Sequence, residues 1–484
     1  MVQRWLTPSR RHDTFEGERL ARASPFHSGH RRPTPFAHAD TNTAAPSLEV
    51  PRDCRFRPPD VGRDMSDTRL FRSLRFYNYR VWAIGALISN IGTWMQRVAQ
   101  DWLVLTVLTA HDASAVGITI ALQFGPQLLL LPLTGYAADH FDRRRLILVT
   151  QALLGLLALG LGLVTVTGVV TLWQVYAFAL GLGCVTAFDA PLRQTFVNDL
   201  VGEAYLANAV ALNSTSFNAA RMIGPAVAGL LIAVVGSGWV FLINAASFAA
   251  VLGSLCLLRH DELYSAARPR HHVGGLTEGF RYVWQRPDLK ATLLMLFVIG
   301  TFGLNFAVYI STMSVRVFHG EAGQYGLLSS CLAVGSVIGA LLAAKRERPR
   351  TRLLCLSTLG FGVFCGLAAL APNPYVFAVA LMLTGLAALT FMTASSALIQ
   401  LSTEPTMRGR VMALRMAITM GGTPLGAPIV GWLADHAGPR WAMSVGTTAG
   451  LVAALIAAGL LMREGRHRTY TVPRARHAPS RHTP

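Results

Sequence analysis

Charged and amide side chains interrupt two segments of the sequence that are otherwise apolar. They are Gln96, Arg97 and Asp101 in the first segment, and Asn213, Asn218 and Arg221 in the second. An arginine or aspartate near the centre of a helix in lipid costs about 2.5 to 3.5 kcal/mol, so such residues rarely face the acyl chains. We therefore expect all six side chains to point into a wet central cavity, where they bind a ligand or exchange protons.

Spacing along the helix allows a second interpretation. Arg97 and Asp101 are four residues apart, so they share one helix face and can form an ion pair. A purely structural network of ion pairs and amides remains an alternative to a ligand site. Asp101 is the best single candidate for a protonatable group. The spans of the second half contain no acidic residue before the outer end of the eleventh stretch.

The segments that must position these residues are long apolar stretches. Of 484 residues, 52% are hydrophobic and only 14% are charged. A hydrocarbon core of about 30 Å needs roughly 20 apolar residues of helix, and a helix satisfies its own backbone polar groups in lipid. Twelve stretches qualify: 81–108, 114–138, 145–167, 171–195, 207–235, 238–258, 291–315, 324–344, 352–371, 375–399, 411–434 and 441–462. The sequence thus predicts an all-α integral membrane protein with twelve transmembrane helices.

Arginine falls almost entirely in every second gap between these stretches. The formal charge of +18 could indicate a nucleic-acid binder, but the positive residues lie in loops and tails, where they indicate topology. Both termini are therefore predicted to be cytoplasmic, and no nucleic-acid partner is expected. Arg316 and Arg440 are the main exceptions to the pattern.

A repeat divides the chain into two halves. Residues of the fifth and eleventh stretches, and a glycine in each of the fourth and tenth, match at one constant offset. We predict a six-helix bundle at 65–258, a cytoplasmic linker with a short interfacial helix at 259–290, and a second six-helix bundle at 291–463. The composition of residues 464–484 predicts a basic disordered tail.

The N-terminal 64 residues are rich in Arg, Pro and His and have no apolar period, which predicts disorder. They are either a start-site error upstream of Met65 or a dispensable tail. The six cysteines are scattered without a CxxC pair, so neither a disulfide framework nor a metal site is expected.

Between the second and third stretches lies a loop with Gly135, Asp139, Arg143 and Arg144. Glycine permits close helix approach, aspartate can meet a helix N-terminus, and arginine can reach carboxylates or phosphates. Such contacts can act as a cytoplasmic gate, forming when that end of the helices is closed and breaking when it is open. The alternative is membrane anchoring by positive charge alone. Asp189 and Arg193, four residues apart at the end of the fourth stretch, fit a gate contact or a helix-end pair.

This loop, Gly135 to Arg145, resembles the loop signature of the major facilitator superfamily. Within that superfamily, residues 187–194, 218–225 and 278–284 resemble the enterobactin-exporter-like and macrolide-efflux-like branch. The resemblance covers roughly residues 69 to 463. Gly224, Pro225 and Gly229 also resemble, in part, the glycine-rich motif of superfamily antiporters, although simple helix packing explains them equally well.

The resemblance implies a secondary active transporter of the cell (inner or plasma) membrane that exports a small hydrophobic or amphipathic molecule by alternating access. It implies a drug, siderophore or secondary metabolite as substrate, protons as coupling ion and a monomer in the lipid bilayer. A facilitator or importer of a small nutrient is the alternative. No nucleotide-binding or catalytic motif stands on a suitable element, so we predict neither an enzyme nor a cofactor.

Overall fold

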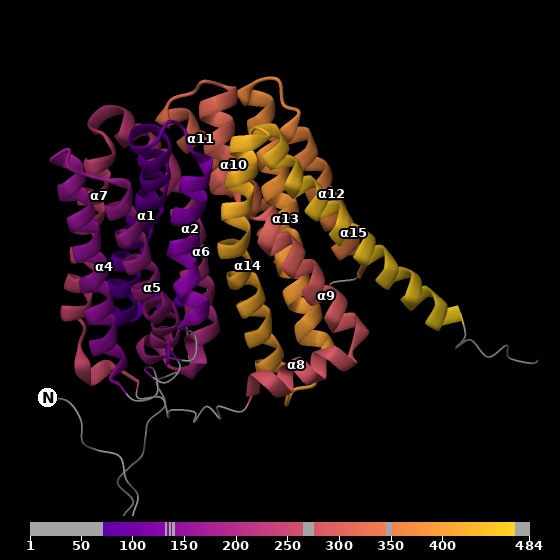
Figure 1. The fold of residues 1–484 in the computed structure, drawn as a ribbon. Helices are drawn as coiled ribbons and strands as arrows, with labels where there is room; N and C mark the ends of the chain where they lie inside the picture. The colour runs from indigo at the N-terminus through magenta and orange to yellow at the C-terminus, as the bar shows by residue number, and fades with distance from the viewer. Residues whose placement is uncertain are drawn as a thin grey trace, which may run out of the picture. The chain divides into compact units, whose positions relative to one another are not determined.

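Every regular element in the described part of the chain is a helix, as Figure 1 shows for a computed structural model of the protein. The structure describes residues 71–130, 133–134, 137, 141–264, 275–344 and 351–469. These residues belong to one compact unit, Ser66–Pro484. The predicted N-terminal extension 1–64 lies outside the described residues. The all-helical class predicted from the sequence is confirmed.

Helices stand at the positions of the first six predicted spans. They are α1 (Tyr77–Trp102), continued by a π-helical segment η2 (Leu103–Leu108), α2 (Ala113–Leu129), α4 (Arg143–Val166), α5 (Leu172–Val201), α6 (Leu206–Val235) and α7 (Ser237–Cys256). Short 3₁₀ turns η1 (Arg72–Arg75), η3 (Glu203–Tyr205) and η4 (His260–Glu262) flank them. The remainder of the second predicted span, up to 138, falls partly outside the described residues. Helix α5 continues to Val201, beyond its predicted end at 195.

The second part of the chain begins with α8 (Gly275–Gln285), the short helix predicted inside the linker. The helices after it are α9 (Pro287–Val298), η5 (Ile299–Gly303), α10 (Phe306–Thr312), η6 (Met313–Val317), α11 (Ala322–Ala344), α12 (Thr351–Ala369), α13 (Pro374–Ser402), α14 (Arg408–His436) and α15 (Pro439–Thr469). Helix α15 extends into the segment predicted as the C-terminal tail, and the rest of that tail lies outside the described residues.

The seventh predicted span, 291–315, is not one regular helix. Helix α9 passes into the π-helical segment η5, the helical path breaks at Leu304 and Asn305, and α10 and a second π-helical segment, η6, follow. The Asn305 side chain donates a hydrogen bond to the carbonyl oxygen of Thr301 (2.7 Å). This bond gives the carbonyl group a partner at the point where the helical path breaks. A break at this depth requires such internal partners, because lipid offers none.

Nine helices of the described residues are long and apolar enough to cross a membrane. Helix α2 is apolar but short, with 17 residues. Helices α1 and α14 are long but carry charged and amide side chains, among them Arg97 and Asp101 in α1 and Arg415 in α14. These polar side chains lower the mean hydropathy of α1 and α14 below that of the nine.

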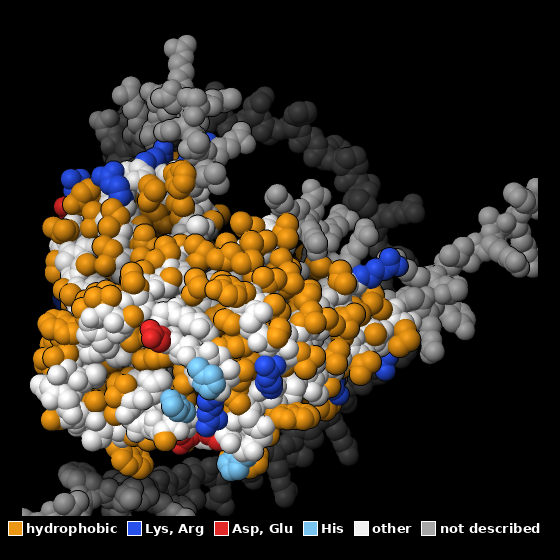
Figure 2. Space-filling model, turned by 90° about the horizontal axis from the view of Figure 1, so that it is seen from above, with side chains coloured by type: hydrophobic (Ala, Val, Ile, Leu, Met, Phe, Trp, Pro, Cys, Tyr) orange, Lys and Arg blue, Asp and Glu red, His pale blue; other side chains and the backbone are white. Residues whose placement is uncertain are grey.

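The outward faces of the helices are strongly apolar. Leu129, Val234, Leu370 and Leu455 are each more than 70% exposed. Figure 2 shows one end of the molecule, where hydrophobic side chains spread widely and charged side chains appear as isolated groups. Exposed apolar surface of this extent requires a partner, and for long apolar helices that partner is the lipid bilayer.

Helices α1, α2 and α4–α7 pack mainly on one another, and α9–α15 do the same. The two groups meet along two helix pairs, α2 with α14 and α6 with α11. Helix α8 packs against α14, where Glu278 and Arg410 form an ion pair (3.2 Å). The interior of the molecule is therefore built where α1, α2 and α6 face α10, α11 and α14.

Candidate functional site

A cavity of about 340 Å³ lies between the two groups of helices. Its walls are largely apolar and aromatic, with contributions from Trp94, Phe124, Phe306, Ile310 and Met392. Among them stand polar and charged side chains, including Arg97, Asp101, Gln123, Arg221, Asn305 and Tyr325. A pocket of this size, mostly apolar and with a few convergent polar groups, is typical of a site for a small organic molecule.

Asp101 makes its main contact with the opposite group of helices. The Tyr325 hydroxyl of α11 donates a hydrogen bond to Asp101 Oδ2 (3.1 Å), and the two side chains are almost fully buried. The Tyr325 ring also stacks on Trp102 of α1, with 6.3 Å between ring centroids. Asp101 is the only carboxylate among the described residues that line this cavity. A change in its protonation therefore acts directly on a contact between the two groups.

Arg97 does not pair with Asp101 as its spacing suggested; the described residues show no ion pair between them. The guanidinium lies instead between two aromatic rings, 5.0 Å from the Trp94 centroid and 4.8 Å from the Phe124 centroid. Such cation–π contacts hold a cation without consuming its hydrogen-bond donors. In place of the expected ion pair, the structure gives the guanidinium two aromatic partners.

Both arginines of the cavity keep buried donors without a partner. Among the described residues, neither Arg97 Nε nor Arg221 Nε and Nη2 has a hydrogen-bond acceptor. Leaving a buried charged donor unsatisfied is costly, so these groups favour an occupant that brings acceptors with it. The cavity is lined by two guanidinium groups and one carboxylate, and the carboxylate is already hydrogen-bonded. The net charge of the lining is therefore positive. The arrangement suits an anionic or hydrogen-bonding moiety on an apolar body.

The other predicted cavity residues lie elsewhere. Gln96, Asn213 and Asn218 line a second cavity, inside the first group of helices, and Arg97 lines both cavities. Gln96 accepts a hydrogen bond from the Asn244 side chain of α7. The structure therefore brings Arg97, Asp101 and Arg221 together in the first cavity, whereas the three amides share the second cavity with Arg97 alone of these three.

The predicted loop signature is described only in part, because Gly135 and Asp139 lie outside the described residues. Arg143 forms an ion pair with Asp199 at the end of α5 (3.2 Å). Arg144 donates a hydrogen bond to the Leu255 carbonyl oxygen of α7 (2.7 Å). Both contacts join helices of the first group. Nothing in the sequence pointed to Asp199 as a partner, because 56 residues separate it from Arg143.

Asp189 and Arg193 lie deeper than predicted, because α5 continues past them. Asp189 is only 4% exposed and accepts hydrogen bonds from Thr150 Oγ1 (2.8 Å) and Gln151 Nε2 (2.7 Å). Arg193 approaches Asp189 to 3.9 Å and donates to Asn90 Oδ1 (3.2 Å). These contacts also stay within the first group of helices.

The glycine-rich motif of α6 serves close packing in the structure. Gly224 lies against Trp94 of α1, while Gly229 faces the Ala322 carbonyl oxygen of α11. A Cβ atom on Gly229 would lie 2.7 Å from that oxygen, a distance that real Cβ atoms do not adopt. Small residues here let α6 and α11 touch backbone to backbone.

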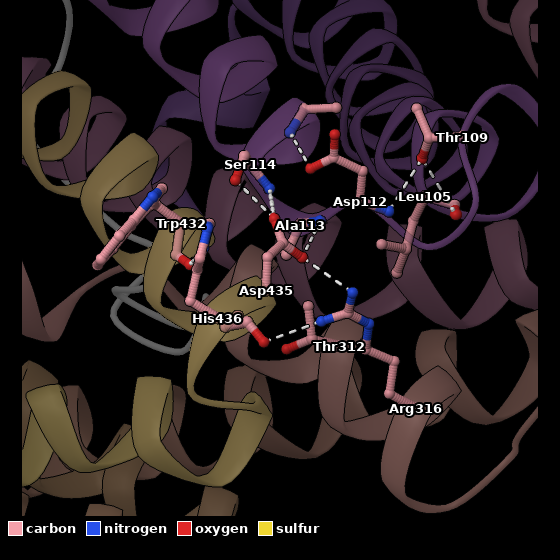
Figure 3. Close-up of polar contacts among 12 residues, drawn as sticks. Leu105, Thr109, Asp112, Ala113, Ser114, Thr312, Arg316, Trp432, Asp435 and His436 are labelled. Atoms are coloured by element: carbon pink, nitrogen blue, oxygen red, sulfur yellow. Dashed lines mark hydrogen bonds and ion pairs between the residues drawn. The ribbon is translucent and has the colours of Figure 1, made fainter.

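A polar cluster that the sequence analysis did not identify joins the start of α2 to the end of α14, as Figure 3 shows. Asp435, at the end of α14, accepts hydrogen bonds from the backbone N–H groups of Ala113 (2.9 Å) and Ser114 (2.8 Å) and from Ser114 Oγ. Arg316 of η6 pairs with the same carboxylate (2.9 Å) and donates to the Ala434 carbonyl oxygen (2.9 Å). A carboxylate of one group thus caps the N-terminus of a helix of the other, where the helix dipole favours it.

Arg316 and Arg440 depart from the charge pattern of the sequence, and this departure could have indicated that each has a local partner. Arg316 is neutralised by Asp435. Arg440 donates to the carbonyl oxygens of Ala369 (2.9 Å) and Ala371 (3.0 Å) at the end of α12. An arginine that has a local anionic or carbonyl partner is held by that partner, whichever end of the helices it lies on.

Three curated relatives match most of the chain. The "Staphyloferrin A transporter" of Staphylococcus aureus (strain NCTC 8325 / PS 47) is 26% identical over 71% of this chain and 86% of that protein. The "Multidrug efflux pump Tap" of Mycolicibacterium fortuitum is 27% identical over 73% and 88%. The "Enterobactin exporter EntS" of Shigella flexneri is 27% identical over 67% and 78%.

Solved structures share the fold at low sequence identity. A bacterial homologue of the human lysosomal transporter Spinster, inward-facing and unoccupied, superposes with a TM-score of 0.63 at 16% identity, covering 81% of this chain and 97% of that one. A D-xylose–proton symporter gives 0.63 at 15% identity, covering 80% and 97%. The family profile described as "Transmembrane secretion effector" matches residues 69–480. The chain therefore belongs to the transmembrane secretion effectors, a family of multi-pass membrane transporters in the major facilitator superfamily.

Proposed function

We propose that the protein exports a small amphipathic molecule by alternating access, with the cavity between the two groups of helices as the transport site. The observation that carries the proposal is this cavity, in which two arginines and a hydrogen-bonded carboxylate stand in apolar and aromatic walls. Each arginine has at least one buried N–H group without an acceptor among the described residues. Two of the three relatives are named as an efflux pump and an exporter, which favours export over the import of a nutrient. A siderophore, drug or secondary metabolite fits both the walls and these names.

The finer topology is part of the proposal. Two six-helix halves, 65–258 and 291–463, cross the membrane twelve times with both termini in the cytoplasm, and the chain acts as a monomer. The packing of helices into two groups that meet along α2–α14 and α6–α11 supports this arrangement. Cysteine labelling of successive loops from either side of the membrane tests it. A pattern with fewer than twelve crossings would contradict it.

Contacts between the two groups of helices at one end support the alternating motion. The Asp435 cluster holds α2 and α14 together at that end, which by the arginine pattern is the outer one. Among the described residues, Arg143, Arg144, Asp189 and Arg193 make their hydrogen bonds and ion pairs within the first half. We propose that these residues, with Gly135 and Asp139, contact the second half when the inner end closes.

We further propose that export is driven by protons and that Asp101 carries the coupled proton. As the sole carboxylate of the described cavity wall, and bonded across the two halves to Tyr325, it is placed to link protonation to movement. Inside-out vesicles report coupling as collapse of an imposed proton gradient when substrate is added. Asp101→Asn should bind substrate but lose this collapse. Full proton-coupled export by the variant would refute the assignment.

The substrate itself is best found in cells. A deletion strain and its complemented parent are compared for susceptibility to toxic compounds and for metabolites in the medium. Export predicts that the deletion strain is more susceptible or retains a metabolite inside. A nutrient importer predicts a growth defect that excess nutrient relieves, and that result would overturn the proposal.

A further inference from the structure

The second cavity, inside the first group of helices, has a volume of about 620 Å³ and is lined by residues of α1, α4, α5, α6 and α7. We propose that it is a second subsite for the transported molecule and receives its polar, hydrogen-bonding part. The inference rests on the proposed function and deepens it, because it defines the class of substrate. Both cavities fall in the size range of sites for small organic ligands, about 300 to 1,000 Å³.

The walls of the second cavity differ in chemistry from those of the first. Aromatic and aliphatic side chains dominate the first, whereas carboxamides recur in the second: Asn90, Gln96, Gln194, Asn213, Asn218 and Asn244. The charged residues of the second cavity are Arg97, Arg193 and Asp189. With two guanidinium groups and one carboxylate, the lining of this cavity also has a net positive charge.

Several hydrogen-bonding groups of this wall remain for a ligand. The oxygens of Asn90 and Gln96 are engaged, by Arg193 (3.2 Å) and by the Asn244 amide respectively. No hydrogen bond among the described residues uses the NH₂ group of either side chain. Asn218 donates to the Ser214 carbonyl oxygen (2.8 Å), which leaves its own oxygen as an acceptor. The wall can therefore donate to and accept from a carboxamide, hydroxyl or hydroxamate group.

Arg97 connects the two cavities because its side chain lines both. Its guanidinium is oriented by Trp94 and Phe124, and its buried Nε has no partner among the described residues. An acidic group bound at Arg97 places an attached apolar body in the first cavity and a polar branch in the second. The geometry thus points to a branched amphipathic anion: one acidic centre, one aromatic or aliphatic arm and one hydrogen-bonding arm.

A polar cavity of this volume could instead be filled with water and serve only to hydrate the helices. The two possibilities differ in one measurable respect. A subsite distinguishes ligands that differ only in the polar arm, whereas a hydrated space with no ligand in it does not.

Two matched probes provide this measurement: N-(1-pyrenebutyryl)glutamine and N-(1-pyrenebutyryl)norvaline. They share the apolar body and the carboxylate and differ in whether a side chain of similar length ends in a carboxamide or a methyl group. Binding is measured on the purified full chain in nanodiscs of phosphatidylethanolamine and phosphatidylglycerol. One or two additional hydrogen bonds should make the glutamine probe bind about tenfold more tightly.

Three variants locate that preference. Thr186→Leu and Val210→Trp each fill the second cavity from a different helix, so failure of one to fold leaves the other. Either should reduce the preference to about twofold or less, while norvaline-probe binding stays within about threefold of the unmodified chain. Ala307→Leu narrows the first cavity and should weaken both probes together with the preference intact.

The failures are distinguishable. If the unmodified chain binds both probes equally, or if the preference survives both second-cavity variants, the second subsite is refuted and the proposed function stands. If the unmodified chain binds neither probe, the anionic amphipathic substrate class is refuted, and the subsite with it.

Discussion

The contact between Asp435 and the start of α2 should decide how readily the closed end of the cavity opens. We predict that Asp435→Ala shifts the protein toward the state in which this end is open. The carboxylate accepts three hydrogen bonds from Ala113 and Ser114 and pairs with Arg316, and its side chain is 17% exposed. All of these contacts except the one to Arg316 cross between the two groups of helices.

The size of the shift follows from the hydrogen bonds that the substitution removes. A hydrogen bond to a charged group contributes about 1.5 to 3 kcal/mol, but neighbouring bonds to one carboxylate are not additive. In the open state water replaces part of them. We therefore expect about 2 to 3 kcal/mol for the cluster, which is roughly a 30- to 150-fold change in the closed-to-open ratio. A protein that is about 99% closed would become about one quarter to 60% open.

Distances between spin labels measure this ratio. Labels at Val169→Cys, between α4 and α5, and Tyr375→Cys, at the start of α13, lie on opposite halves at the closed end, and both positions are exposed. They are introduced in a background without other cysteines. The unmodified pair should give a single distance distribution. Asp435→Ala should add a longer one of comparable weight.

Asp142→Ala is the matched control. Asp142 is also a carboxylate at the start of a helix, accepting from the Arg145 backbone N–H of α4 (2.8 Å), and both residues belong to the same half. Its removal should cost about 1 kcal/mol of stability without moving the distance distribution. The reasoning is wrong if Asp435→Ala leaves the distribution unchanged, or if Asp142→Ala changes it equally.

Three further outcomes follow from the contacts. Tyr325→Phe removes the hydroxyl that bonds Asp101 and should lower the thermal unfolding midpoint and slow proton-coupled transport at least about fivefold, whereas unchanged transport would exclude a role for this bond. Gly117→Leu adds a Cβ atom that would lie 2.4 Å from the Ala427 carbonyl oxygen, so it should keep the Asp435 end open in the same spin-label assay; a closed distribution would contradict this. Arg143→Gln leaves its partner carboxylate on α5 unpaired and should destabilise the protein by about 1 to 3 kcal/mol in a denaturation experiment, with unchanged stability indicating that the ion pair is dispensable.

Much of the helical architecture could be predicted because lipid imposes it. Helix α6 runs over Leu206–Val235 and α7 over Ser237–Cys256, close to the predicted 207–235 and 238–258. An apolar stretch in a bilayer has to close its own backbone hydrogen bonds, so length and composition suffice to place it. The break at Asn305 could not be predicted in this way, since it depends on side chains that supply the missing bonds locally.

The interior location of Arg97, Asp101 and Arg221 could be predicted from the sequence, but their contacts could not. The cost of burying Arg97, Asp101 and Arg221 in an apolar segment is a property of the sequence, and it indicated an interior location for each. Spacing along the helix favoured an Arg97–Asp101 pair, yet aromatic rings from two helices hold the guanidinium elsewhere. Sequence spacing reports only neighbours on the same helix.

The order of residues alone therefore establishes a helical membrane protein in which a few costly polar side chains must avoid lipid. Which groups meet those side chains depends on how the helices pack. Tyr325 is 224 residues from Asp101, and Ser114 is 321 residues from Asp435. Such partners come together only when α1 faces α11 and α2 faces α14, because apolar helices pack by shape and carry no sequence mark of the helix that will lie beside them.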